Sequence, residues 1–278
     1  PAMGEEEISD DRTAGASELA RRAIDVIARE ALRAGDLAGT RREQERLAGL
    51  RPSMVAIEGA LAIFSELLEK HAAGGPWEQA VEKARTEART RLEASRRGVV
   101  RSGLRVLDDV RPRRIVTISC SSTVRAVLEA RPPAAILVSE GRPGLEGRTI
   151  AVGFASLVGE VTVCTDGALA RLLEEGDMVL CGADAVESDG HLVNKVGTFA
   201  LALAAARTSI PFYAACESFK FSRRSGIVLE EMEGAEVWDA APDGVVVRNP
   251  YFERTPPDLV TGFITDDAVL SWVDGGLR

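Results

Sequence analysis

The first hundred residues carry apolar side chains at the spacing of amphipathic helices. One stripe recurs at i, i+4, i+7 and i+11, which places its members on a single helical face. This stripe consists of Ile57, Leu61, Phe64 and Leu68. The break Gly74-Gly75-Pro76 ends that helix, and a second helical stretch runs from about Trp77 to Leu107. The pattern predicts a helical N-terminal domain over residues 1–110.

From Arg111 onward, short apolar strands alternate with helical segments. Each strand candidate is apolar almost throughout, as expected for strands that are covered on both faces. The strand candidates are Ile115–Ser119, Ala134–Ser139, Val161–Thr165, Met178–Cys181 and Pro211–Ala215, with a further possible strand at Val245–Arg248. The helix candidates are about Thr123–Glu129, Thr149–Val158, Ala168–Glu174 and Asn194–Ala206. This alternation predicts an α/β fold with a doubly wound parallel sheet in a second domain, residues 111–278.

The net charge and the hydropathy of the chain limit the kinds of ligand and the cellular location that we expect. The net charge of −9 argues against nucleic acid as the main ligand, because phosphate contacts need a basic surface. A local basic pocket for a small phosphorylated ligand remains compatible with it. No apolar run reaches the ~18 residues of a membrane-spanning helix, and the acidic N-terminus lacks the apolar core of a signal peptide. We therefore expect a cytoplasmic protein without membrane contact.

The cysteines and histidines exclude further classes of chemistry. None of the four cysteines forms a CxxC pair, which favours buried thiols in a reducing compartment. His71 and His191 are the only histidines, so neither a zinc site nor a Ser-His-Asp hydrolase is expected.

Candidate chemistry collects where the predicted strands end. Ligands of open α/β sheets bind outside the carboxyl ends of the strands. A single acid there is commonly a helix cap or a solvated loop residue, but a series of acids and a thiol on one edge favours a site. The residues that follow the five strands are Cys120, Glu140, Asp166, Asp184 and Glu217.

Two of these positions have informative neighbours. Ser121, Ser122 and Thr123 follow Cys120 at a helix start, where backbone N–H groups and hydroxyls suit a phosphate and would lower the thiol pKa. Asp184 ends a Gly-Ala-Asp segment and offers a carboxyl group for proton transfer.

Positive charge is expected along the same edge. Asn194 and Lys195 are predicted to begin a helix near Asp184, where an ammonium would add to the helix dipole. Arg142 and Lys220 lie in loops at strand ends, where phosphate binding is plausible although a solvated arginine is the commoner case.

Four runs of sequence resemble one superfamily. It joins ribose-1,5-bisphosphate isomerases, methylthioribose-1-phosphate isomerases and the regulatory subunits of the translation initiation exchange factor two-B. The similar runs are ILVSEGRPGLEGR, VLCGADAVESDGHLVNKVGTFALAL, IPFYAACESFKF and NPYFERTPPDLVTGFIT. The resemblance covers roughly Arg51 to Asp267 and implies a helical N-terminal domain, a Rossmann-like C-terminal domain and a homodimer or higher homo-oligomer.

The resemblance also implies roles for individual residues. Cys120 and Asp184 match the catalytic pair of the isomerases, and no cofactor or metal is implied. Some regulatory subunits also have a cysteine at this position, so the pair is more informative than Cys120 alone. The strand-end positions and the family resemblance together give nine substrate-binding candidates: Arg51, Ser121, Ser122, Thr123, Glu140, Arg142, Asn194, Lys195 and Lys220.

The sequence departs from the isomerase pattern at three places. The Arg-Gly-Ala segment near the isomerase N-terminus aligns best with residues 13–17, which keep Gly-Ala but lack the arginine; Arg12 is a possible substitute. Thr123 replaces a lysine of the bisphosphate isomerases, and Gly141 replaces the usual threonine of the methylthioribose enzymes. The first two changes remove positive charge and put a bisphosphate substrate in doubt.

The leading prediction is an aldose-ketose isomerase that converts a ribose-1-phosphate-type sugar phosphate to its ribulose form. In it Asp184 acts on the ring oxygen and hydroxyls, and Cys120 either moves the C2 proton or holds the site for a hydride shift. The alternative is a non-catalytic regulatory or sensing protein that binds a sugar phosphate or nucleotide.

Overall fold

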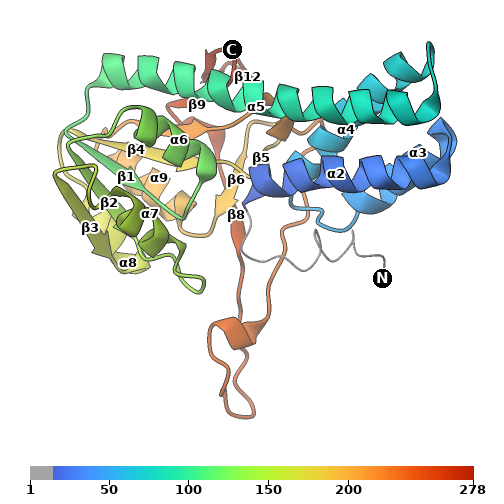
Figure 1. Cartoon of the computed structure of the whole chain (residues 1–278). Helices are drawn as coiled ribbons and strands as arrows, with labels where there is room; N and C mark the ends of the chain where they lie inside the picture. Colours follow the sequence, from blue (N-terminus) through green and yellow to red (C-terminus); the bar gives the residue numbers. More distant parts are fainter. Residues whose placement is uncertain (1–14) are drawn as a thin grey trace.

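The computed structural model describes residues 15–278 as a helical half beside a sheet half (Figure 1). Helix α5 runs along both halves and connects them. The helices of the first half are α2 (Ala16–Ala34), α3 (Leu37–Ala48), α4 (Val55–Ala72) and α5 (Trp77–Val110). Their apolar faces form one core, in which the predicted stripe of α4 is fully buried, so the helical N-terminal half is confirmed. Among the helices of this described part, none combines the length and apolarity that a membrane crossing needs.

The second half is built on a seven-stranded sheet in the order β10-β9-β7-β4-β1-β2-β3. All neighbouring strands are parallel except the edge pair of β9 and β10. The strands are β1 (Arg114–Thr117), β2 (Ala135–Ser139), β3 (Glu160–Cys164), β4 (Asp177–Gly182), β7 (Phe212–Ala215), β9 (Gly262–Ile264) and β10 (Val269–Leu270). The helices and 3₁₀ turns between them are α6 (Ser122–Ala130), α7 (Glu146–Phe154), α8 (Asp166–Leu169), η1 (Ala170–Leu172), α9 (Thr198–Arg207), η2 (Ser218–Lys220) and η4 (Pro257–Leu259).

Successive side chains of the central strands enter two different cores. Ile115 packs with α5, α6 and α7 on one face of the sheet, whereas the next residue, Val116, packs with α8 and α9 on the other. Met178 and Val179 of β4 divide in the same way. Because alternate residues of a strand point to opposite faces, burial on both sides requires the apolar runs seen in the sequence. The doubly wound parallel sheet and its five predicted strands are therefore confirmed, with ends shifted by one or two residues.

The helix predicted at Ala168–Glu174 lies two residues earlier, because α8 begins at Asp166 and η1 ends at Leu172. The domain boundary at residue 110 stays a prediction. The second half of α5 packs against the sheet, so one helix contributes to the cores on both sides of that boundary.

A three-stranded antiparallel sheet, which was not expected from the sequence, stands beside the main sheet. It has the order β5-β6-β8, with β5 at Ala185–Val186, β6 at Leu192–Lys195 and β8 at Phe252–Thr255. The prediction that Asn194 and Lys195 begin a helix is wrong, because both pair with β8. Gly190 has a φ of +83° in the turn before β6, and Gly197, at +103°, delays the helix until Thr198. A hairpin of β11 (Trp272–Val273) and β12 (Gly276–Leu277) ends the chain.

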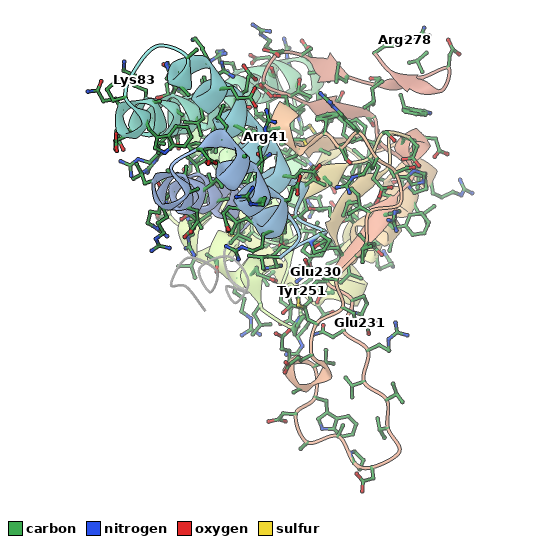
Figure 2. All side chains as sticks on the ribbon, turned by 90° about the vertical axis from the view of Figure 1, so that its right-hand side faces the viewer. Arg41, Lys83, Glu230, Glu231, Tyr251 and Arg278 are labelled. Carbon is green, nitrogen blue, oxygen red and sulfur yellow. The ribbon has the colours of Figure 1, made fainter. Side chains whose placement is uncertain are left out.

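Residues 228–250 form an arm that extends away from both halves (Figures 1 and 2). It contains the 3₁₀ turn η3 (Gly234–Glu236) and closes at its base with a single bridge between Glu231 and Pro250. The strand predicted at Val245–Arg248 lies here and does not form. Its neighbours on the arm offer no ladder to pair with, and Val246 is largely exposed.

The two halves meet tightly at one glycine. A Cβ added at Gly59 of α4 would lie 2.0 Å from the carbonyl oxygen of Phe219 in η2, far inside van der Waals contact. The segment that carries Lys220 is thereby held against the helical half. We expect Gly59→Ala to separate these two backbones and to cost a net 1–3 kcal/mol, roughly the usual price of overpacking, even though alanine favours the helix.

This first prediction is tested by thermal and urea unfolding of Gly59→Ala beside Gly74→Ala. A Cβ at Gly74 meets no atom within 4 Å, so that control should unfold like the wild type. Equal midpoints for the two variants would contradict the tight contact.

Candidate active site

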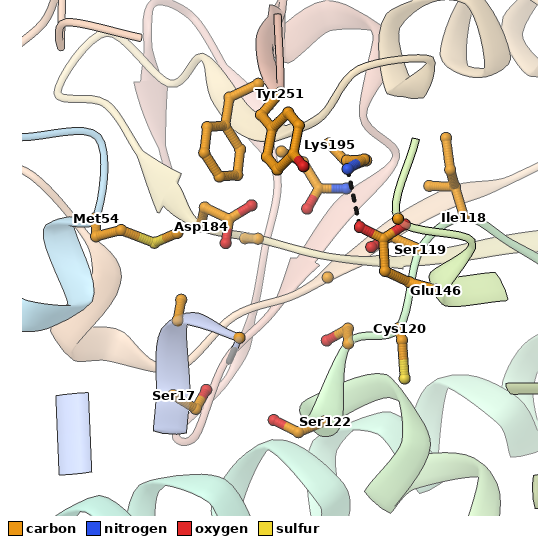
Figure 3. A pocket seen from close by; sticks show the side chains of 18 of the residues that line it. Ser17, Met54, Ile118, Ser119, Cys120, Ser122, Glu146, Asp184, Lys195 and Tyr251 are labelled. Carbon is orange, nitrogen blue, oxygen red and sulfur yellow. Dashed lines mark hydrogen bonds and ion pairs between the residues drawn. The ribbon is translucent and has the colours of Figure 1, made fainter. Parts of the chain in front are cut away.

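A cavity of about 360 Å³ opens between the two halves, at the carboxyl ends of β1 and β4 (Figure 3). Its size matches the lower range of small-molecule sites. The lining residues come from the start of α2, the segment before α4, the start of α6, the start of α7, the end of β4, the strand β6, the turn η2 and the residues around β8. Of the sequence-predicted site residues, it is lined by Arg51, Cys120, Ser121, Ser122, Asp184, Asn194, Lys195 and Lys220.

Cys120 reaches the cavity through a turn that directly follows β1. Ser119 has a φ of +62°, a conformation that is uncommon for residues other than glycine and is found at functional sites. Ser121 then caps α6 by accepting a hydrogen bond from the Val124 amide over 3.3 Å. The end of β4 comes so close that a Cβ at Gly182 would lie 2.5 Å from the Ser121 hydroxyl. Glycine in the Gly-Ala-Asp segment therefore allows Asp184 and the Cys120 turn to share one cavity.

Burial raises the pKa of Asp184 to about 6. Lys220, Lys195 and Arg51 pull this pKa down, and Glu230 raises it further. A carboxyl group with a pKa near neutrality exists in both forms near pH 6 and suits the transfer of a proton.

The prediction of a lowered pKa for Cys120 is wrong. Burial raises the pKa of this thiol, and it outweighs the opposing effect of Arg125. Glu146 adds to the increase. Near neutral pH, Cys120 is therefore a neutral thiol, in spite of its place next to a helix start.

A buried carboxylate lies beneath the cavity and connects three segments. Glu217 Oε1 accepts hydrogen bonds from the hydroxyls of Ser17 over 3.1 Å and Thr123 over 2.7 Å, and its Oε2 lies 2.8 Å from the ammonium of Lys220. Burial alone would raise the pKa of Glu217, but Lys220 and Thr123 hold it below its usual range. Burial acts to lower the pKa of Lys220, but Glu217 and Asp184 raise it, so the pair is charged.

Two further cations at the cavity also have carboxylate partners. Lys195 Nζ lies 2.9 Å from Glu146 Oε1 and 4.0 Å from the ring centre of Tyr251. Figure 3 marks the ion pair with Glu146 by a dashed line. Arg51 is almost fully buried and donates from Nε to Glu230 over 2.8 Å. Figure 2 shows Glu230 and Tyr251 close together, where the arm leaves the body.

Three predicted substrate-binding residues do not line the cavity. Thr123 is fully buried, and its hydroxyl is used by Glu217. Glu140 pairs with Arg148 over 2.8 Å, and Arg142 is exposed and donates to the Val237 carbonyl of the arm.

The loop after β2 turns these last two side chains outward. Its backbone is held by Asp166, whose carboxylate accepts from the amides of Gly141 and Arg142 over 2.9 and 2.8 Å. Asp166 is therefore a support for the loop and not a member of the cavity wall.

Sequence reasoning missed several lining residues. Glu146 stands in the first turn of α7, where an acid is an ordinary partner for the helix dipole and gives no sign of a site. The apolar members come from separate regions that meet only in the fold. The lining residues that were missed include Ser17, Met54, Glu146, Met232, Tyr251 and Phe252.

One group of potential metal ligands occurs within residues 15–278, and it lies outside the cavity. Glu187, Asp189 and His191 bring ligand atoms within 4.8 Å of one another. The buried Glu187 is already engaged, because its carboxylate accepts from Arg254 and from the Ile227 amide. The expectation that no metal or cofactor is needed stays a prediction.

Comparison with known proteins places the chain in a family. Residues 10–271 match the model of the Initiation factor 2 subunit family. The chain belongs to this family. A methylthioribose-1-phosphate isomerase of Exiguobacterium sibiricum is 31% identical over 276 residues, which cover 90% of this chain and 79% of the relative. A ribose 1,5-bisphosphate isomerase of Archaeoglobus fulgidus is 36% identical over 140 residues, 47% of this chain and 44% of the relative.

The fold has a close match among solved structures. A structure titled translation initiation factor eIF-2B, from Pyrococcus horikoshii, superposes with a TM-score of 0.80 at 26% identity, covering 96% of this chain and 94% of that one. Family relatives thus include sugar-phosphate isomerases as well as proteins named for translation initiation. Membership alone does not choose between the two classes.

The pKa of Asp184 leads to a prediction about stability. Its folded value of about 6 exceeds the ordinary 3.8, so between these values the folded state binds more protons than the unfolded state. Stability contributed by this group therefore falls as pH rises from about 4 to 6. Above pH 7 the charged form costs up to about 3 kcal/mol, which Asp184→Asn should restore.

Thermal unfolding at pH 4 and pH 7.5 tests this second prediction. The variant should melt several degrees above the wild type at pH 7.5 and together with it at pH 4. Asp243→Asn, an exposed position on the arm, should behave as the wild type at both values. A lower midpoint for Asp184→Asn at pH 7.5 would show that the carboxylate stabilises the fold.

Proposed function

We propose that this chain is an aldose-ketose isomerase that acts on a ribose-1-phosphate-type sugar phosphate. The observation that carries the proposal is the presence, in one cavity, of Cys120 and an Asp184 carboxyl group whose pKa is about 6. The family's sugar-phosphate isomerases lend it further support. The expected homodimer or higher homo-oligomer and the cytoplasmic location stay predictions.

The first step of the proposed reaction opens the sugar ring. The phosphate on C1 locks the ring, so the C1–ring oxygen bond must break before the carbonyl group can move. Asp184 in its acid form donates its proton to the ring oxygen as this bond breaks. The electron pair of the bond goes to the ring oxygen, and C1 becomes an oxocarbenium carbon that the phosphate oxygen stabilises.

The second step moves hydrogen from C2 to C1. A hydride migrates with its electron pair from C2 to C1, and the C2 hydroxyl gives its proton to the Asp184 carboxylate, which leaves a ketone at C2. Asp184 thereby recovers the proton that it lost in the first step. The raised pKa of Cys120 favours this route over proton abstraction by a thiolate, and gives the thiol the role of excluding water beside C2.

Backbone N–H groups are the proposed anchor of the phosphate. The first residues of α2, Gly15 to Ser17, and of α6, Ser121 and Ser122, line the same cavity. Gly15 is the N-cap of α2 and provides no side-chain cap. Two helix N-termini that converge on one cavity favour an anion between them. Lys220 would contact the phosphate, and Lys195 would contact the developing oxyanion.

A second candidate is a sensing protein that binds a sugar phosphate or nucleotide without turnover. The similarity to the Pyrococcus horikoshii structure named for translation initiation supports it. The arginine that the isomerase pattern carries near its N-terminus is absent here, and Arg12 lies outside the described residues. Binding without product formation would favour this candidate.

The third prediction is isomerase activity. Purified protein is incubated with 5-methylthioribose 1-phosphate, ribose 1-phosphate and ribose 1,5-bisphosphate, and ketose formation is followed by NMR. We expect product from at least one of the three sugars. Asp184→Asn should lower kcat by about 100-fold or more, the usual cost of losing a positioned acid or base. Cys120→Ser should also lower kcat, because the hydroxyl group of serine holds water beside C2 more readily than the thiol does.

Cys164→Ser is the matched control for the thiol, because Cys164 is also partly exposed but ends β3 outside the cavity wall. It should keep wild-type activity. Failure of all three sugars to react, with binding still detected by calorimetry, would overturn the isomerase proposal and leave the sensing protein.

The fourth prediction concerns pH. Because Asp184 must start as the acid, kcat/KM should fall about tenfold per pH unit above about pH 6. A sugar phosphate also titrates near pH 6, so the informative quantity is the ratio of wild-type to Asp184→Asn kcat/KM, in which that titration cancels. The ratio should fall above pH 6. A ratio that rises up to pH 6 and then levels off would indicate that Asp184 acts from its carboxylate form, and would contradict the proposed first step.

A further inference from the structure

The cavity has no net positive charge among its described residues. Three cations line it, and each has a carboxylate within 3 Å: Glu230 for Arg51, Glu146 for Lys195 and Glu217 for Lys220. Asp184 adds a further negative charge whenever it is ionised. This balance is unusual for a site that has to attract a strongly anionic ligand.

Of the three partner carboxylates, only Glu146 belongs to the cavity wall. Glu217 and Glu230 lie behind their cations, with 1% and 16% of their side chains exposed, whereas 30% of the Glu146 side chain is exposed. Figure 3 shows its carboxylate between Lys195 and Cys120, on the side of the cavity away from Met54. A ligand in the cavity therefore meets this charge directly.

The surrounding chain is shaped to hold a carboxylate at this position. A Cβ at Gly141, whose φ is +77°, would lie 2.8 Å from Glu146 Oε2, and a Cβ at Gly144 would lie 2.9 Å from its Oε1. Two glycines thus leave room for both oxygens. Lys195 is fixed from the opposite side by the ring of Tyr251. Oε2 of Glu146 is buried without a hydrogen-bond partner among the described residues, so Lys195 is the main group that neutralises the Glu146 carboxylate.

We propose that Glu146 is a specificity-determining residue, which restricts the cavity to sugars that carry a single phosphate and an uncharged group at the other end. The inference rests on the proposed function for the identity of the sugar. One phosphate binds to the N–H groups of α2 and α6. A second phosphate would bring further negative charge toward the Glu146 carboxylate and toward Lys195, which Glu146 already neutralises. Met54, Met232 and Phe252 give the far side of the cavity an apolar wall.

The fifth prediction is that Glu146→Gln relaxes this restriction. Binding of ribose 1-phosphate and ribose 1,5-bisphosphate is measured by calorimetry in a Cys120→Ser background, so that turnover does not disturb the heats. With Glu146 present, the monophosphate should bind at least about tenfold more tightly. Glu146→Gln should tighten the bisphosphate roughly 10- to 100-fold, as expected for removing one nearby like charge, and change the monophosphate by less than about threefold.

Two further variants make the result specific. Glu146→Ala removes the charge without the amide and should shift the preference in the same direction. Glu174→Gln removes a carboxylate that is also ion-paired, with Arg113, but stands exposed outside the cavity wall, and should change neither affinity. The thermal midpoint of each unliganded variant checks that it is folded.

The proposal would be overturned if the protein with Glu146 bound the bisphosphate more tightly, or if both Glu146 variants left the bisphosphate affinity unchanged. It would also be overturned if neither sugar bound. The binding data are independent of turnover. If the charge-dependent shift appears while the NMR assay of the wild type gives no ketose, the role of Glu146 stands and the isomerase proposal fails.

Discussion

The buried pair of Glu217 and Lys220 is the interaction on which the site depends. The Glu217 carboxylate accepts hydrogen bonds from one hydroxyl group at the start of α2 and from one in α6. It also neutralises Lys220, whose side chain is 3% exposed. A carboxylate buried to this extent is tolerated only when it is paired and hydrogen-bonded, so all of its partners must be present together. Because Ser17 belongs to the helical half and Thr123 to the sheet half, the cavity between the halves exists only when both have folded. The close contact of Gly59 with Phe219 holds the lysine segment in the same place.

This pair also sets the chemistry of its neighbour. Burial raises the pKa of Asp184. Lys220 has the largest opposing effect of the three cations that lower this pKa. Had the cations at the cavity lacked partners, their attraction would be expected to keep Asp184 ionised at all ordinary pH values. Burial outweighs the three cations, and Glu230 adds to the increase, so Asp184 remains able to take and release a proton near pH 6.

Much of this arrangement could be predicted from the sequence, because its signals are local. The continuous apolar runs identified the parallel strands, and the polar residues behind them identified the edge of the sheet that holds Cys120 and Asp184. Signals failed where the outcome depends on contacts between distant segments. Glu140 and Arg142 follow a strand end as expected, yet Asp166 holds their loop so that both point away. Asn194 and Lys195 resemble a helix start, but pairing with β8 makes them a strand. The pKa of Cys120 depends on burial, which no motif reveals.

The pairing of the cations bears on the choice between an enzyme and a sensing protein. A site that only has to hold a phosphorylated ligand gains affinity from unpaired cations, and each carboxylate beside them weakens binding. A site that has to protonate a ring oxygen gains from such a carboxylate when it raises the pKa of the acid, as Glu230 does for Asp184. The paired cations of this cavity attract anions less strongly, and the cavity retains a titratable Asp184 and a neutral thiol. That exchange is useful to a catalyst and costly to a sensor, which is why the isomerase is the function that the geometry favours.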